Sequence, residues 1–168
     1  AKAVLVDEDT GCLTRSSACA YQTYVPRDGW VEQRPSEWWT ATKHAIRDLM
    51  RMIDENEHAS LDVTAISVTG QMQDLILLDP DSGQASHDSA ILYSDQRATS
   101  EATELTKRLG RTIGSDSLMA KMLWVDRNWD NTVTTSAIGA ADFIVWKMSG
   151  AHVTDPTTAS VSALTVPL

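Results

Sequence analysis

Short apolar runs that end in polar or turn-forming residues restrict the fold of this chain more than any other feature. Each run is too short for a buried helix and is rich in Val, Ile and Leu, which favours strands. We therefore expect strands at residues 3–6, 63–69, 75–78 and 90–93. The acidic turn after the first run, followed by a second extended segment, predicts a hairpin over residues 3–23.

Residues at helical spacing follow several of these runs. Pro35 and Glu37 predict a helix start, because proline suits the first turn and a carboxylate suits the positive end of the helix dipole. The apolar face of this helix is expected to contain Trp38, Trp39, Thr42, Ala45, Ile46, Leu49 and Ile53. Further helices are expected from Ser94 or Asp95, either of which can cap one, to about residue 109, over 119–128, and over 141–148 up to a left-handed Gly150.

The order of these elements predicts an α/β fold. Hairpins come first, and strands then alternate with helices, which favours a mixed, partly parallel sheet with helices packed on it. A loop is expected over residues 25–34. The length of 168 residues fits about one domain.

Composition excludes several classes of protein. The formal net charge of −9 argues against nucleic-acid binding, because phosphates repel an acidic surface. No apolar run approaches the ~20 residues of a membrane span, and Cys12 and Cys19 fit two reduced thiols. No phosphate-loop, dinucleotide or metal-ligand motif is present, and the four histidines are dispersed. We therefore expect a cytoplasmic protein with no metal site, no nucleic-acid partner and no membrane partner.

A polar insertion between two of the expected strands raises the question of function. Gly70, Gln71, Met72, Gln73 and Asp74 separate the apolar run 63–69 from the run 75–78. Amides and a carboxylate at a fixed strand tip can donate and accept hydrogen bonds to a small ligand. Composition and spacing alone indicate no more than an α/β domain with this polar tip.

Six sequence blocks, in order, extend the interpretation. They are GWVEQRPSEWW, AISVTGQMQDLILLD, AILYSDQR, MAKMLW, AADFIVWKMSG and HVTDPTTAS. Together they resemble the first part of a carbohydrate kinase of the FGGY family, closest to its xylulokinase-like members. The resemblance implies an actin-like, ribonuclease-H-like fold of two domains. It also implies an enzyme that phosphorylates a hydroxyl of a sugar or polyol with Mg²⁺ and ATP.

The resemblance also implies a sugar site. Residues just after the strand-end glycine contact the sugar in relatives, where xylulokinases carry Met-His, glycerol kinases carry Arg-Glu and this chain has Met72-Gln73. Tyr93 falls where relatives place an aromatic residue beside the polyol carbons. The expected substrate-binding residues are therefore Met72, Gln73, Tyr93 and Asp95, supported by Gly70, Gln71 and Arg97.

Other readings of some of these residues remain open. Asp95 and Arg97 could instead form an ion pair and helix cap, and Tyr93 could pack in the core. Asp142 and Asp155 also match family positions, and for them a structural role is favoured.

The remaining parts of a family kinase are expected outside residues 1–168. These are the first strand with its phosphate-binding turn, the catalytic aspartate and the C-terminal nucleotide domain. The chain is thus expected to be part of an N-terminal sugar-binding domain that is inactive alone. The expected partners are ATP and a sugar such as a xylulose-like ketose, and a homodimer is one expected oligomeric state. The alternative is a non-catalytic sugar-binding or regulatory relative on the same fold.

Overall fold

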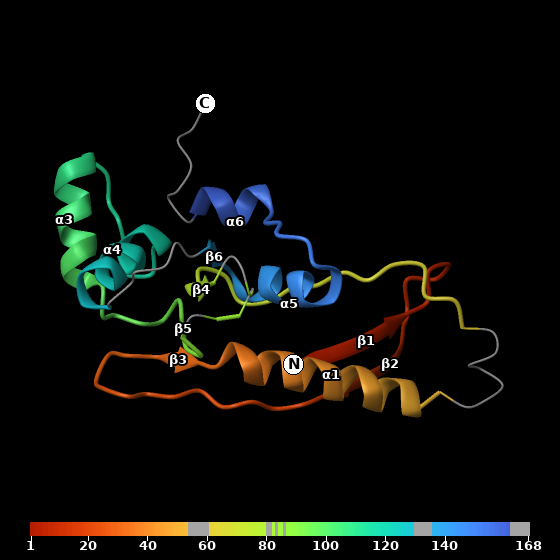
Figure 1. The fold of residues 1–168 in the computed structure, drawn as a ribbon. Helices are drawn as coiled ribbons and strands as arrows, with labels where there is room; N and C mark the ends of the chain where they lie inside the picture. Colours follow the sequence, from red (N-terminus) through yellow and green to blue (C-terminus); the bar gives the residue numbers. More distant parts are fainter. Residues whose placement is uncertain (54–60, 80–81, 83, 86, 130–135, 162–168) are drawn as a thin grey trace. The chain divides into compact units, whose positions relative to one another are not determined.

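The computed structural model describes residues 1–53, 61–79, 82, 84–85, 87–129 and 136–161 (Figure 1). The chain forms two compact units. The first contains residues 1–22 and 36–68, and the second contains residues 23–35 and 69–168. Each unit is described by itself.

The first unit begins with an antiparallel hairpin of β1 (Lys2–Val6) and β2 (Leu13–Ala18). Its turn is held by Asp7, whose Oδ1 accepts hydrogen bonds from the backbone N–H and the hydroxyl of Thr10 at 2.8 and 2.6 Å. Gly11 closes the turn with a φ of 67°, a left-handed conformation that glycine adopts without steric cost. The hairpin predicted over residues 3–23 is confirmed, with a shorter second strand.

The long helix α1 (Pro35–Arg51) is also confirmed. Its buried residues recur every three or four positions, as one face of a helix requires: Trp38, Ala41, Ala45 and Leu49. The segment before it lies against its first turn, where the backbone N–H of Gln22 donates to the Glu37 carboxylate at 3.3 Å.

The buried strand expected over residues 63–69 is wrong. The described structure contains no strand there, and the side chains of Val63 and Ile66 are 53% and 66% exposed. β-branched residues favour an extended backbone, but a strand forms only when a neighbouring strand supplies its hydrogen bonds. No strand among the described residues pairs with this segment.

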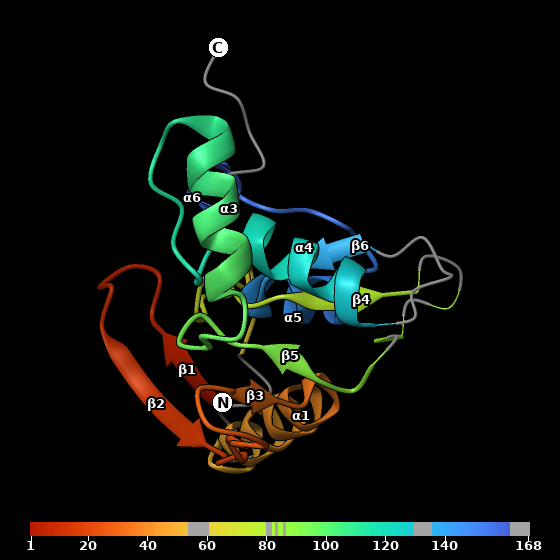
Figure 2. The same ribbon diagram turned by 90° about the vertical axis from the view of Figure 1, so that its left-hand side faces the viewer.

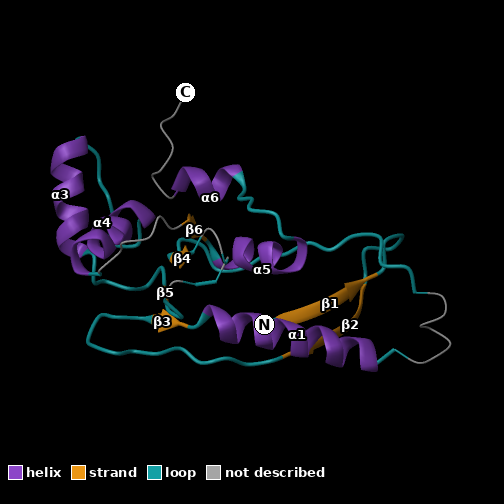
Figure 3. Cartoon of the chain, in the orientation of Figure 1, coloured by secondary structure: helices purple, strands orange, loops and turns teal. Residues whose placement is uncertain are grey.

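The second unit contains two short ladders, which Figure 3 shows as small arrows among loops. β3 (Glu32–Gln33) pairs with β5 (Ala90–Ile91), and β4 (Ile76–Leu78) pairs with β6 (Ser136–Ile138). A bridge between Leu75 and Ile91 connects the two ladders. All the ladders of the described residues are antiparallel, whereas the order of elements favoured some parallel pairs. The loop expected over residues 25–34 in fact contains β3, along which β5 runs back.

Four helices complete the described part of the second unit: α3 (Thr99–Leu109), α4 (Leu118–Asn128), α5 (Ala140–Ser149) and α6 (Pro156–Val161). Helices α3 and α4 lie side by side (Figure 2). The expected left-handed Gly150 is confirmed at φ 76°, and its N–H donates to the carbonyl of Trp146. None of the helices in the described ranges is long and apolar enough to cross a membrane.

The start expected at Ser94 or Asp95 for the second predicted helix is wrong. Helix α3 begins at Thr99, and its N-cap residue Ala98 makes no side-chain capping bond. Neither Ser94 nor Asp95 therefore caps it. The Asp95 carboxylate is instead occupied by donors from Val31 and Arg97, which leaves it no geometry for capping a helix four residues later.

The core of the second unit gathers around β4, β5, α3 and α4. Its buried members are Leu75, Leu77, Ile91, Ala98, Ala102, Ile113, Leu118, Ala120, Trp124 and Val125. This core surrounds the residues that follow the polar insertion, so it holds the insertion at the end of a rigid strand.

Candidate functional site

The polar insertion ends in a left-handed residue. Gln73 has a φ of 60° and is the one non-glycine residue with positive φ in the described structure. Such a conformation is unfavourable for a residue with a Cβ and persists only where surrounding contacts fix it. Gln73 lies at the change from exposed to buried residues, since Met72 before it is 56% exposed and Asp74 after it is fully buried.

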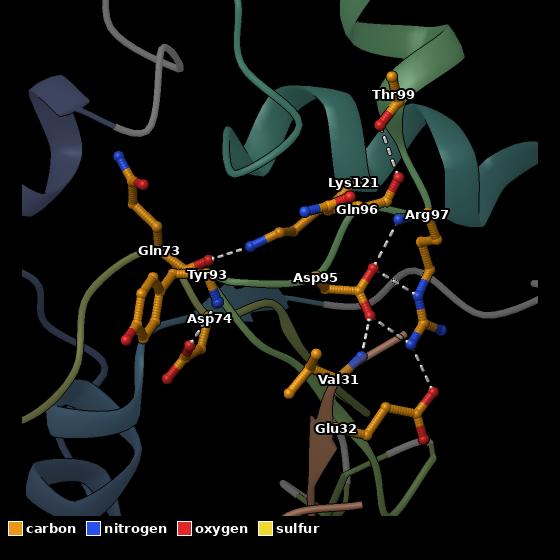
Figure 4. A network of polar contacts seen from close by, with 10 residues as sticks. All are labelled: Val31, Glu32, Gln73, Asp74, Tyr93, Asp95, Gln96, Arg97, Thr99 and Lys121. Atoms are coloured by element: carbon orange, nitrogen blue, oxygen red, sulfur yellow. Dashed lines mark hydrogen bonds and ion pairs between the residues drawn. The ribbon is translucent and has the colours of Figure 1, made fainter. Parts of the chain in front are cut away.

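Lys121 supplies one contact that fixes this conformation. Its Nζ donates a hydrogen bond of 2.5 Å to the backbone carbonyl of Gln73 (Figure 4). Lys121 lies on the buried face of α4, three residues after Leu118 and three before Trp124, and its side chain is 0% exposed. A fully buried lysine is rare, because removing an ammonium from water is costly unless polar groups replace the water.

Asp74 is the second buried charge at the tip. One oxygen, Oδ1, accepts the backbone N–H of Tyr93 at 3.0 Å, whereas Oδ2 has no hydrogen-bond partner. Burial raises the pKa of Asp74 to about 7, against the lowering effects of the Tyr93 N–H and the charge of Lys121. Burial likewise lowers the pKa of Lys121 to about 8, against the charge of Asp74. Asp74 and Lys121 therefore stabilise each other's ionised form.

Tyr93 follows the end of β5 and is open to solvent. Its side chain is 54% exposed, while the two preceding residues, Ile91 and Leu92, are buried. The alternative in which the Tyr93 ring packs in the core does not fit this exposure. Its backbone, in contrast, is anchored by Asp74. Figure 4 shows the Tyr93 ring and the Gln73 side chain extending on the same side of the network of polar contacts.

Asp95 and Arg97 form a buried ion pair. The Asp95 carboxylate accepts the backbone N–H and Nε of Arg97, both at 2.9 Å, and its Nη2 at 2.7 Å. It also accepts the N–H of Val31 at 2.6 Å, and the Arg97 Nη2 bonds Glu32 at 2.7 Å. All four contacts to Asp95 come from the protein, so the ion-pair reading has direct structural support. A substrate contact by Asp95 stays a prediction.

Two tryptophan rings enclose this ion pair. The Arg97 guanidinium carbon lies 3.9 Å from the ring centroid of Trp30 and 5.2 Å from that of Trp124, and the two rings meet edge to face at 5.3 Å. Cation–π contacts of this kind partly replace the hydration that a buried guanidinium loses. The network thus ties the segment before β3 to the segment after β5.

Gly70 and Gln71 take supporting positions. A Cβ on Gly70 would lie 3.2 Å from the backbone nitrogen of Ala141, so a side chain there would press on the first turn of α5. The Gln71 amide donates to Gln33 Oε1 at 2.7 Å, and the Gln33 amide donates to the Thr23 hydroxyl. These contacts fix the segment that leads into the polar insertion.

The two aspartates for which a structural role was favoured lie at helix starts. Asp142 is in the first turn of α5. Asp155 precedes α6, and its Oδ1 accepts the backbone N–H groups of Thr157 and Thr158 at 2.8 and 3.0 Å, as an N-cap residue does. Asp155 therefore caps the start of α6, which is a structural role.

The structure brings Gln73 and Tyr93 together through two residues that sequence reasoning left out of the site. Asp74 was seen as part of the polar insertion but given no role, and Lys121 was hidden within MAKMLW. A charged residue on the apolar face of a predicted helix was the available signal for Lys121. Within the described ranges, no three His, Cys, Asp or Glu side chains are grouped to hold a metal ion.

Comparison with known proteins places this chain in a family. Residues 1–165 match the model of the N-terminal domain of the FGGY family of carbohydrate kinases. The chain is 26% identical to a xylulose kinase of Staphylococcus xylosus over 93% of its length and 33% of the relative, and 27% identical to a glycerol kinase of Thermotoga maritima over 97% and 36%. It thus spans about a third of the length of these curated relatives.

Solved structures agree on the fold. The xylulose kinase of Rhodospirillum rubrum superposes with a TM-score of 0.85 at 23% identity, covering 96% of this chain and 34% of the other. A xylulose kinase of Brucella ovis superposes with a TM-score of 0.81 at 24% identity, over 96% and 34%. These neighbours confirm the expected α/β, actin-like fold. The chain belongs to the FGGY family of carbohydrate kinases, whose N-terminal domain residues 1–165 match.

Proposed function

We propose that the full-length protein transfers the γ-phosphoryl group of ATP to a hydroxyl of a sugar, and that this chain supplies part of the sugar site. Membership of the FGGY family supports the reaction class. The observation that carries the assignment of the site is the arrangement of Gln73 and Tyr93, whose backbones are fixed by buried charges while an exposed phenol and a half-buried amide remain beside them.

A xylulose-like ketose is the sugar that we propose. Relatives of this chain include kinases of xylulose and of glycerol. The pair Met72-Gln73 stands where the resemblance places Met-His in xylulokinases and Arg-Glu in glycerol kinases, and an amide replaces an imidazole more closely than a carboxylate does. The amide and the imidazole both donate and accept hydrogen bonds, as a sugar hydroxyl requires.

Each site residue has a simple chemical role in this proposal. The Gln73 amide bonds a sugar hydroxyl, the Tyr93 ring covers the C–H face of the carbon chain, and Met72 adds an adaptable apolar contact. Asp95 and Arg97 hold the segment that follows Tyr93, and a direct contact of Asp95 with the sugar stays part of the proposal. The catalytic aspartate implied by the family resemblance lies outside this chain. Magnesium would accompany ATP and neutralise its phosphates, as the family resemblance implies.

A panel of sugars and polyols, each assayed for ADP release by the full-length protein with Mg²⁺ and ATP, tests this function. We expect ADP release with xylulose or a related ketose and at least ten times less with glycerol. Binding of these sugars without ADP release would instead favour the non-catalytic relative. Equal or greater activity with glycerol would overturn the choice of sugar.

A further inference from the structure

Two buried, oppositely charged side chains reach the backbone at both proposed sugar contacts. Lys121 Nζ bonds the carbonyl of Gln73, and Asp74 Oδ1 bonds the N–H of Tyr93. Both residues are 0% exposed, so their charges are stabilised by protein groups in place of water. We infer that Lys121 and Asp74 are positioning residues, which set the sugar specificity of the site by fixing the backbones of Gln73 and Tyr93.

The contact of Lys121 is more than a hydrogen bond to a spare carbonyl. Gln73 is left-handed, so its carbonyl points away from the direction that a regular strand would give it. A cationic donor on this carbonyl stabilises the conformation that turns the Gln73 side chain away from Asp74. Without the donor, the backbone of Gln73 loses one of the contacts that hold it in an unfavourable region.

Asp74 couples this residue to the next strand. It is adjacent to Gln73 in the chain, and it bonds Tyr93 across the tip, 19 positions away in sequence. A shift of the Gln73 backbone would therefore carry Asp74 with it and release the N–H of Tyr93. The bridge between Leu75 and Ile91 lies directly behind, with bonds of 2.8 and 3.0 Å, and confines any such movement to the tip.

The contact with the tip also explains why a charged residue is present in an apolar core. A buried ion pair is weak evidence for stability, and replacement by apolar residues is often neutral or stabilising. Lys121 lies on the face of α4 that also carries Leu118 and Trp124, where a leucine or methionine would fit the pattern. A lysine at that position is better explained by its contact with the tip than by core stability.

Kinetics of the full-length protein test this inference, which rests on the proposed function. Lys121→Met removes the ammonium and keeps the length of the side chain. We expect its kcat/KM for the sugar to fall about 5- to 50-fold, mainly through KM, while the KM for ATP stays within twofold. Lys107→Met, at an exposed position of α3, is the matched control and should change neither. An unchanged kcat/KM for the sugar in folded Lys121→Met would overturn the inference.

Substitutions at Asp74 separate the hydrogen bond from the charge. Asp74→Asn keeps an acceptor for the N–H of Tyr93 and should lower kcat/KM for the sugar less than threefold. Asp74→Ala removes the acceptor and should lower it at least tenfold. Equal effects of the two variants would contradict a role through Tyr93.

If Lys121→Met does not fold, Lys121→Gln, which is neutral and still polar, takes its place with the same expected defect.

Hydrogen–deuterium exchange provides a measurement that does not depend on activity. In Lys121→Met, the amides of residues 71–74 and of Tyr93 should exchange at least tenfold faster than in the wild type, while those of α1 stay unchanged. Wild-type protein that is inactive on every sugar would refute the proposed function, and exchange would still decide the positioning. Unchanged exchange at these amides would refute the positioning itself.

Discussion

The Asp95 carboxylate accepts three hydrogen bonds from Arg97, one from the backbone and two from the guanidinium, and both side chains are fully withdrawn from solvent. The pair ties the segment before β3 to the segment after β5, which directly follows Tyr93. Its strength can be measured apart from any catalytic role, because the contacts lie behind the exposed surface of the tip.

Breaking this pair should be costly. Asp95→Asn leaves the buried Arg97 guanidinium beside Glu32 but without the charge of Asp95, and we expect a loss of up to about 3–5 kcal/mol in the free energy of unfolding. Asp48→Asn is the matched control, since Asp48 pairs with Arg51 on the exposed surface of α1 and should cost less than about 1 kcal/mol. Chemical denaturation of the full-length protein measures both. Equal losses would show that Asp95 does not brace the fold.

Truncation of Tyr93 should affect sugar binding more than stability. The ring is 54% exposed, so Tyr93→Ala should cost less than about 1 kcal/mol of stability while raising the sugar KM about tenfold. Tyr93→Trp should be tolerated, because the family resemblance implies an aromatic residue at this position. Trp124→Ala, in the buried core, should instead cost about 3–5 kcal/mol. A large fall in melting temperature for Tyr93→Ala with normal sugar kinetics would remove Tyr93 from the site.

The pH dependence of stability should reveal the buried charges. The pKa of Asp74 is raised to about 7 in the folded state from 3.8, so the folded state holds a proton that the unfolded state has lost. Stability should therefore fall as pH rises from about 4 to 7, by up to about 1.4 kcal/mol per pH unit. Asp74→Asn abolishes this component. A stability difference between wild type and variant that does not change over this range would contradict the burial of a charged Asp74.

Because of Lys121, we expect stability to change with pH in the opposite direction at alkaline pH. Its pKa is lowered to about 8 in the folded state from 10.5, through burial and the charge of Arg97, against the charges of Asp74, Asp95 and Asp116. The unfolded state then binds more protons between pH 8 and 10.5, so stability should rise over that range. Denaturation of wild type and Lys121→Met at several pH values measures it. A wild type and variant with parallel curves would show that Lys121 titrates normally.

The sequence predicted those parts of the fold whose signals are local. The hairpin turn at Asp7, the face of α1 through Trp38 and the left-handed Gly150 each follow from residue types at fixed spacing, and each was confirmed. The exposed segment 63–69 was missed because its valines and isoleucine favour a strand, whereas strand formation depends on a partner elsewhere. Pairing is a property of the tertiary structure, and composition does not contain it.

The candidate site was predictable in part. The polar tip stood out because polar residues directly follow an apolar run, whereas Tyr93 was singled out by the resemblance to the family. Lys121 did not, because its contact joins residues 48 positions apart through a hydrogen bond to a backbone carbonyl, and every residue type carries that carbonyl. The cap assigned to Asp95 was wrong for a similar reason, since its donors Val31 and Arg97 include one that is 64 positions away.

The specificity constant of Gln73→Ala for its sugar tests the central claim most directly. Loss of a hydrogen bond to a buried sugar hydroxyl should cost roughly 1–3 kcal/mol, so kcat/KM for the sugar should fall about 10- to 100-fold with the KM for ATP nearly unchanged. Gln22→Ala, at an exposed position of the first unit, is the control and should match the wild type. A Gln73→Ala variant that folds and keeps the wild-type kcat/KM for the sugar would contradict the assignment of this strand tip as the sugar site.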